Sequence, residues 1–134
     1  MARYQGRLSG PLLDRIDIQV EVPAVSADAL AAAPDGEATG PVAARVGAAR
    51  ARALQRQGGP NADLKGEALE RWCALDDPSS AFLRSAAARL GWSARSYHRV
   101  LRLARSVADL AGSDTIALAH LAEAIQYRRV LAVQ

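Results

Sequence analysis

Residues 90–128 read LGWSARSYHRVLRLARSVADLAGSDTIALAHLAEAIQYR, and this stretch decides the fold. Between Ser93, a good helix N-cap, and Gly112, a good stop, apolar side chains recur at three- and four-residue spacing. These apolar residues are Tyr97, Val100, Leu101, Ala104, Val107, Ala108 and Ala111. The pattern returns over 118–129, which ends in two arginines suited to a helix C-terminus. The stretch therefore predicts two consecutive amphipathic helices.

Three further helices are predicted upstream of this stretch. Thr39 can cap a helix that Pro41 starts and that runs to about Gln57, because proline is harmless in a first turn. The loop GGPNADLKG then precedes a short helix over 66–75 and a longer one over 78–90. We expect a mainly α fold, in which a helical lid domain of four to five helices occupies 41–134. A linker with one short helical turn is expected at 26–40.

The N-terminal region carries a different pattern, LLDRIDIQVEV over 12–22. Ile16, Ile18, Val20 and Val22 alternate with polar residues until Pro23, which predicts a half-buried strand. A lone strand is unstable, and the sequence offers no second one. It could pair with another chain, lie unpaired against the helices, or belong to a sheet whose other strands are outside this sequence. We favour the last, so that 1–25 is the tail of an α/β core.

Composition allows one compact domain, since half of the 134 residues are hydrophobic. The formal charge is +3, and Lys65 is the only lysine among many arginines. Arginine suits phosphate contacts, but the same bias follows from codon usage, so the charge permits a nucleic-acid partner without indicating one.

The single cysteine, Cys73, rules out a disulfide framework within these residues and is expected to be a small buried hydrophobe in a reduced, cytoplasmic setting. No apolar run approaches the roughly 18 residues that span a bilayer, so no membrane partner is expected.

Motifs that could complete ATP chemistry or hold a metal are absent from the sequence. It contains neither a GxxxxGK[ST] loop nor an apolar run ending in paired acids, so these residues alone are expected to be inactive toward ATP. It also lacks HExxH and GxSxG. His98 and His120 fall on different predicted helices and are read as ordinary histidines rather than metal ligands.

The string RLSGPLLDRIDIQVEVPAV, residues 7–25, resembles the segment that follows sensor 1 in magnesium-chelatase-like AAA+ ATPases, bacterial proteins linked to competence and DNA branch migration. The resemblance implies that Arg15 is an arginine finger reaching the ATP of a neighbouring subunit, with Asp14 in support. Such a guanidinium stabilises charge on the γ-phosphate and is worth roughly 10³ to 10⁵ in rate. The alternative is that Arg15 pairs with Asp14 or Asp17 at a strand entrance.

Residues 90–128 resemble the lid of the same family, and the SxR from Ser93 to Arg95 matches its sensor 2 position. Independently, Arg95 falls in the first turn of a helix, where the dipole disfavours a cation by about 0.3 to 1 kcal/mol. A γ-phosphate held there offsets this. The alternative is that Arg95 extends into solvent.

Two arginine stripes are candidate DNA contacts. One lies on the first lid helix, and the other on the side of the 93–112 helix that is expected to be exposed, where Arg105 also falls. The candidates are Arg45, Arg52, Arg56, Arg99 and Arg102. Phosphate binding requires the two stripes to converge, and otherwise they are solvated faces.

The resemblance implies the C-terminal part of a hexameric ATPase that uses ATP and Mg²⁺ to remodel DNA, for example by branch migration. The runner-up is a motor that inserts a metal into a tetrapyrrole. A different class is a stand-alone basic helical module that binds DNA or protein without ATP.

Overall fold

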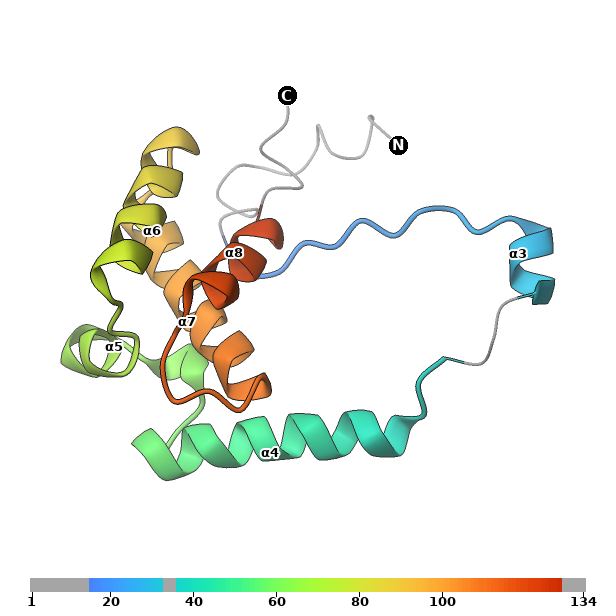
Figure 1. The fold of residues 1–134 in the computed structure, drawn as a ribbon, viewed down its shortest axis with the longest axis horizontal. Coiled ribbons are helices and arrows are strands. Elements are labelled where there is room, and N and C mark those ends of the chain that lie inside the picture. Colours follow the sequence, from blue (N-terminus) through green and yellow to red (C-terminus); the bar gives the residue numbers. More distant parts are fainter. Residues whose placement is uncertain (1–14, 33–35, 129–134) are drawn as a thin grey trace.

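The computed structural model describes residues 15–32 and 36–128, and Figure 1 shows them as a chain of helices. The elements are α3 (Ala27–Ala32), α4 (Thr39–Gln57), the 3-10 turn η1 (Asn61–Asp63), α5 (Gly66–Trp72), α6 (Asp77–Arg89), α7 (Ala94–Leu110) and α8 (Leu118–Gln126). The predicted mainly α fold is confirmed. The five helices expected in the lid are α4 to α8, in the predicted order and with bounds that differ by a few residues.

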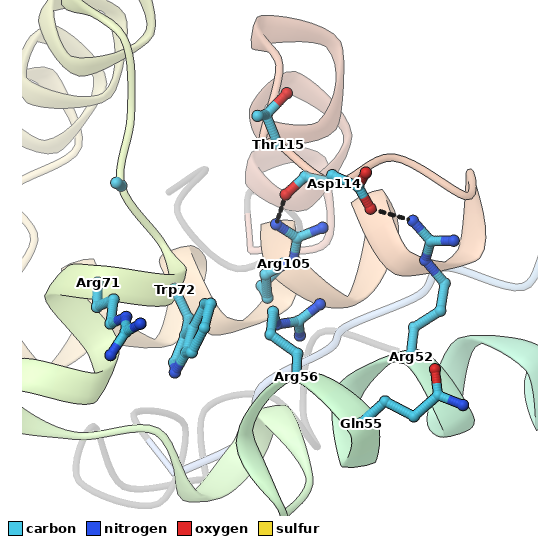
Figure 2. Close-up of a pocket in the computed structure, with 9 residues that line it drawn as sticks. Arg52, Gln55, Arg56, Arg71, Trp72, Arg105, Asp114 and Thr115 are labelled. Carbon is cyan, nitrogen blue, oxygen red and sulfur yellow. Dashed lines mark hydrogen bonds and ion pairs between the residues drawn. The ribbon is translucent and has the colours of Figure 1, made fainter.

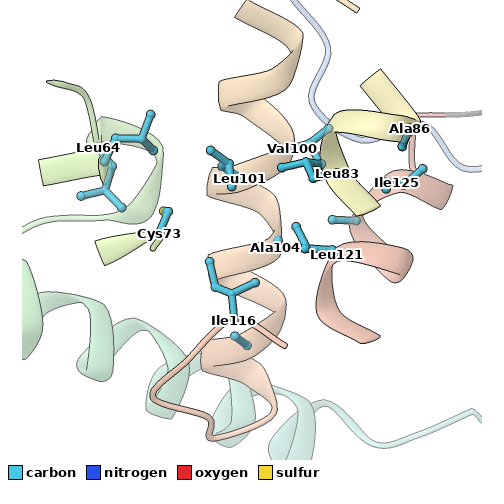
Figure 3. Packing of buried hydrophobic residues seen from close by; sticks show 13 residues of the cluster. Leu64, Cys73, Leu83, Ala86, Val100, Leu101, Ala104, Ile116, Leu121 and Ile125 are labelled. Atoms are coloured by element: carbon cyan, nitrogen blue, oxygen red, sulfur yellow. The ribbon is translucent and has the colours of Figure 1, made fainter. Parts of the chain in front are cut away.

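Helix α7 forms the centre of the bundle and packs against α4, η1, α5 and α8. Its apolar stripe is the reason, because Val100, Ala104 and Ala108 are fully buried. Figure 3 shows α7 between Leu64 and Cys73 on one side and Leu83, Leu121 and Ile125 on the other. One continuous apolar cluster therefore joins α5, α6, α7 and α8.

The helix ends follow local signals in the sequence, with one exception. Ser93 caps α7 as predicted, since its hydroxyl accepts a hydrogen bond from the Ser96 N–H at 3.2 Å. Gly112 adopts a positive φ of 71° just beyond α7, which favours glycine there. The prediction that Thr39 caps α4 is wrong, because Thr39 is already helical and Ala38 is the N-cap without a side-chain hydrogen bond. Pro41 still lies in the first turn, where its missing N–H does no harm.

The strand predicted over 12–22 does not form in residues 15–22, and residues 12–14 lie outside the described residues. Ile18, Val20 and Val22 are 50%, 64% and 78% exposed. A strand needs a ladder of backbone hydrogen bonds to a partner strand, whereas among the described residues this segment makes a single bond between backbone groups, from Gln19 N–H to the Tyr127 carbonyl at 2.8 Å. Among the described residues the segment has no partner strand, and the favoured interpretation, a sheet whose other strands lie outside this sequence, stays a prediction.

The linker contains the expected short helix, α3, which Figure 1 shows standing apart from α4–α8. The first half of α4 also extends beyond the bundle. Ala53 is the one buried residue of α4, and Val46 remains exposed. Among the helices that the structure describes, none is both long and apolar enough to cross a membrane.

Candidate functional site

Arg15 is the first described residue, and its side chain is exposed. Within residues 15–32 and 36–128 the structure gives it no hydrogen bond or ion pair. Asp17, one of the partners considered for it, instead accepts a hydrogen bond from Arg99 Nη1 at 2.8 Å. Asp14 lies outside the described residues. The Arg15 guanidinium is thus presented to solvent.

Three contacts hold the residues after Arg15 against the helical domain, and we call them the N-terminal latch. They are the Asp17–Arg99 ion pair, the hydrogen bond from Arg128 Nη1 to the Ile16 carbonyl at 3.1 Å, and the Gln19–Tyr127 backbone bond. Sequence reasoning missed this latch, because no regular spacing relates residue 17 to residue 99 or residue 16 to residue 128. The latch fixes the segment beside the start of α7 and the end of α8.

Arg95 lies exposed in the first turn of α7, as predicted. That turn contains no acidic residue, and the described part of the chain gives the Arg95 side chain no ion-pair partner. The next residue, Ser96, is buried, and its hydroxyl lies 3.4 Å from Arg128 Nη2. Arg128 therefore bridges the residue after Arg15 and the residue after Arg95. The structure brings the two predicted ATP-contacting arginines to the same end of the bundle.

The candidate DNA-contacting arginines each have an acceptor within the chain. Arg45 pairs with Glu37, and Arg102 Nη1 donates to the Leu64 carbonyl at 2.9 Å. Arg52 pairs with Asp114 at 2.6 Å. Arg52 and Arg56 line one cavity (Figure 2), whereas Arg99 and Arg102 line another. Arg99 and Arg102 thus lie on a different cavity from Arg52 and Arg56, whereas Arg105 of the second stripe lines the same cavity as Arg52 and Arg56.

Arg105 was expected on the exposed side of α7, and that prediction is wrong. Its side chain is 1% exposed, and its Nη2 lies 3.1 Å from Asp109 Oδ1. Nη1 and Nη2 also donate to the carbonyls of Asp114 and Ser113. Because its donors find acceptors on the loop before α8, the guanidinium is retained inside the domain. Burial lowers the pKa of Arg105 below its ordinary value.

Asp109 is the acceptor at the centre of this buried network. Arg56 Nη1 and Nη2 donate to it at 2.6 and 2.9 Å, and Asn61 Nδ2 at 2.8 Å. Burial alone would raise the pKa of Asp109, but these hydrogen bonds and the charge of Arg105 outweigh it, so the pKa lies below its ordinary value. The network ties α4, η1 and α7 together. The sequence contained a signal for this network. Asp109 is the one acidic residue of α7, and a carboxylate among apolar helix positions needs a cation as its partner when it is buried.

The remaining titratable candidates have structural environments. Cys73 is buried as predicted, and burial raises the pKa of its thiol to about 11. His120 Nδ1 accepts a hydrogen bond from the Ala117 N–H at 3.0 Å at the start of α8, and His98 meets Tyr97 edge-on. In the part of the chain that the structure describes, no group of three His, Cys, Asp or Glu residues could hold a metal ion.

The fold and these contacts define a small α-helical domain with Arg15 and Arg95 exposed at one end. Residues 36–128 match the family described as magnesium chelatase, subunit ChlI C-terminal, and residues 1–30 match magnesium chelatase, subunit ChlI. The chain belongs to the magnesium chelatase ChlI C-terminal family, as the resemblance of residues 90–128 suggested.

Bacterial relatives extend this assignment. The chain is 42% identical over 130 residues to competence protein ComM of Haemophilus influenzae, covering 96% of this chain and 26% of that protein. It is 39% identical over 129 residues to the uncharacterized protein YifB of Escherichia coli, with 96% of this chain and 26% of that protein covered. The chain thus spans about a quarter of the length of these curated relatives.

Proposed function

We propose that this chain supplies an arginine finger, Arg15, and a sensor 2 arginine, Arg95, to ATP hydrolysis by a magnesium-chelatase-like AAA+ protein that remodels DNA. The proposal rests on the placement of these two side chains. Arg15 and Arg95 are exposed and have no ion-pair partner among the described residues, and the residues that follow them, Ile16 and Ser96, both contact Arg128.

The arginines near Arg15 and Arg95 are paired within the chain, which sets these two apart. At the same end of the molecule, Arg99 is held by Asp17 and Arg128 by Ile16 and Ser96. Among the described residues none accepts a hydrogen bond from the Arg15 or Arg95 side chain, so their donors are available for a ligand. Each guanidinium offers five N–H groups in a planar fork that fits phosphate oxygens. An anion beside Arg95 also offsets the unfavourable position of this cation at a helix N-terminus.

The proposed division of labour follows from the motifs. ATP and Mg²⁺ would be held by a phosphate-binding loop that this sequence does not contain. Arg15 would stabilise the charge that develops on the γ-phosphate of the neighbouring subunit in a hexameric ring. Arg95 would respond to the γ-phosphate from the start of α7 and pass its loss to the bundle.

Similarity to a competence protein supports DNA as the object of this work. The family description supports a second candidate, a motor for metal insertion into a tetrapyrrole. A third candidate, a basic helical module without ATP linkage, is compatible with the net charge of +3. The three differ in whether ATP turnover responds to DNA, to a tetrapyrrole, or to neither.

The test uses a longer chain that contains both these residues and a GxxxxGK[ST] loop. Arg15→Ala is expected to lower its ATPase rate by roughly 10³-fold or more, because a finger supplied by a neighbour acts in the transition state. Arg95→Ala is expected to lower it too. Arg84→Ala, an exposed arginine on α6, is the matched control and should leave the rate unchanged.

Mixing Arg15→Ala subunits with subunits that lack the phosphate-binding lysine should restore part of the activity, because only a finger acting between subunits can be complemented in this way. Unchanged hydrolysis in both arginine variants would favour the binding module. The 134-residue chain alone is expected to show no turnover of ATP, and clear turnover by pure protein would contradict the proposal.

A further inference from the structure

A cavity of about 570 Å³ opens between α4, α5 and the loop that joins α7 to α8, away from the latch that holds Arg15. Figure 2 shows its walls. Helix α4 contributes Arg52, Gln55 and Arg56, α5 contributes Arg71 and Trp72, and α7 contributes Arg105. Arg56 and Arg105 also hold the buried carboxylate of Asp109, whereas Arg52 and Arg71 have no such role in the interior of the domain.

The charge of the cavity favours an anion. Arg56 and Arg105 share a single carboxylate, Asp109, and Arg52 pairs with Asp114. Arg71 has no carboxylate within ion-pair distance among the described residues. Four positive groups and two negative ones leave two positive charges in excess, which attracts anions and disfavours cations.

Unused hydrogen-bond donors favour a ligand rich in acceptors. Arg105 Nε is buried and has no hydrogen-bond partner in the described part of the chain, although the side chain lines the cavity. Arg52 uses only its Nη2 atom on Gly112 and Asp114, which leaves the other donors of that guanidinium available. A phosphate group offers several acceptor oxygens to such donors, in the fork geometry that arginine prefers.

The electrostatics of the cavity wall also favour an anion. Burial and the nearby charge of Arg56 both lower the pKa of Arg105, and Asp109 only partly compensates. A bound anion would relieve the repulsion between the Arg56 and Arg105 guanidiniums.

The aromatic wall selects among anions. The Arg71 guanidinium lies over the Trp72 ring at 4.5 Å from its centroid. Figure 2 shows Trp72 lying between Arg71 and Arg56, so that an indole separates two phosphate-binding side chains. Aromatic platforms beside arginines are the usual means of holding an unpaired base next to its phosphate. An acidic protein segment would meet the charge but would leave the indole unused.

We propose that this cavity binds a nucleotide unit, with its phosphate held by the arginines of the wall and its base beside Trp72, either as a free nucleotide or within a single nucleic-acid strand. The cavity is separate from Arg15 and Arg95. The nucleotide-binding proposal can therefore be wrong while the proposed ATPase role is right, and the reverse also holds.

The 134-residue chain is tested directly with fluorescein-labelled oligo(dT) of about 15 nucleotides, which spans a typical single-strand site, by fluorescence anisotropy. Arg71→Ala is expected to weaken binding about tenfold, the loss of one charged hydrogen bond to phosphate, and to lower the salt slope by about 1. Arg71 forms no ion pair with a described residue, so its removal breaks only its contact with the Trp72 ring, and circular dichroism checks that the fold is kept. Arg52→Gln provides a second variant, with circular dichroism to check its fold.

Arg84→Ala removes the same charge from an exposed position on α6 and is the matched control. AMP, inorganic phosphate and poly-glutamate serve as competitors. Displacement by AMP at a similar nucleotide concentration identifies a free nucleotide, and displacement only by unlabelled strand identifies single-stranded nucleic acid. Equal losses in Arg71→Ala and Arg84→Ala, competition by poly-glutamate as strong as by strand, or no binding of strand and AMP would each overturn the proposal.

Discussion

The α4–α8 bundle and residues 15–26 both carry regular apolar patterns in the sequence. The pattern becomes a buried face in the bundle but not in residues 15–26. The apolar stripe of α7 reaches the interior, where Val100 and Ala104 are fully buried, whereas Val20 and Val22 stay largely exposed. A helix satisfies its backbone hydrogen bonds within itself, but a strand requires a second strand. A helical pattern is thus enough to predict local structure, while an alternating pattern also needs its partner.

The largest expected effect lies in the buried network of the bundle. Asp109→Asn leaves Arg105, which is 1% exposed, and Arg56 without a counter-charge, so the free energy of unfolding should fall by about 3–5 kcal/mol. Urea denaturation measures it. The control is Asp63→Asn, an exposed site with no ion pair among the described residues, which should stay within about 0.5 kcal/mol of wild type. Equal values for the two variants would refute the structural role given to Asp109.

The next prediction contrasts the two regions directly. Leu121 is fully buried at the α7–α8 contact, and Leu121→Ala should cost about 2–5 kcal/mol through lost contacts and a residual cavity. Val20→Ala removes an apolar side chain from the exposed segment and should change stability by less than about 0.5 kcal/mol. The same urea experiment compares them. If Val20→Ala proved as damaging as Leu121→Ala, residues 15–26 would belong to the core.

Acid should weaken the bundle through Asp109. The pKa of Asp109 in the folded chain lies below its ordinary value of 3.8, so its contribution to stability is complete above that pH and is lost as the pH falls through the folded value. The stability gap between wild type and Asp109→Asn should therefore narrow between neutral pH and about pH 3. Other acid-sensitive carboxylates are common to both proteins and cancel. A gap that is independent of pH would contradict this linkage.

The sequence alone predicted the helical class, the order of α4–α8, the cap at Ser93 and the burial of Cys73. These features depend on residues a few positions apart, so local physics determines them. The strand predicted over 12–22 does not form in residues 15–22, because the described part of the chain offers it no partner strand, and the Thr39 cap failed because α4 begins one residue earlier than expected.

The site was predicted less completely, for a related reason. Arg15 and Arg95 came from a family resemblance, which finds positions but not their surroundings. Arg105 was placed on the wrong side of α7, because its acceptors at Ser113 and Asp114 lie on a loop whose path the helical period does not encode. The pairings of Arg52 with Asp114 and of Asp17 with Arg99 join residues far apart in sequence, which only the folded chain reveals.

The smallest expected effect concerns the contact between residues 15–26 and the α4–α8 bundle. Asp17→Asn removes the ion pair with Arg99, whose side chain is 18% exposed while that of Asp17 is 62% exposed, so solvent screens the pair and global stability should fall by less than about 1 kcal/mol. The local effect should be clearer. The Gln19 amide, bonded to the Tyr127 carbonyl, should exchange with solvent faster, while amides in the centre of α7 stay protected. Hydrogen exchange followed by NMR separates the two. Unchanged exchange of the Gln19 amide would mean that Asp17 does not hold the segment. Faster exchange of the α7 amides together with that of Gln19 would mean that the segment is a structural part of the bundle, and the contrast between the two regions would be lost.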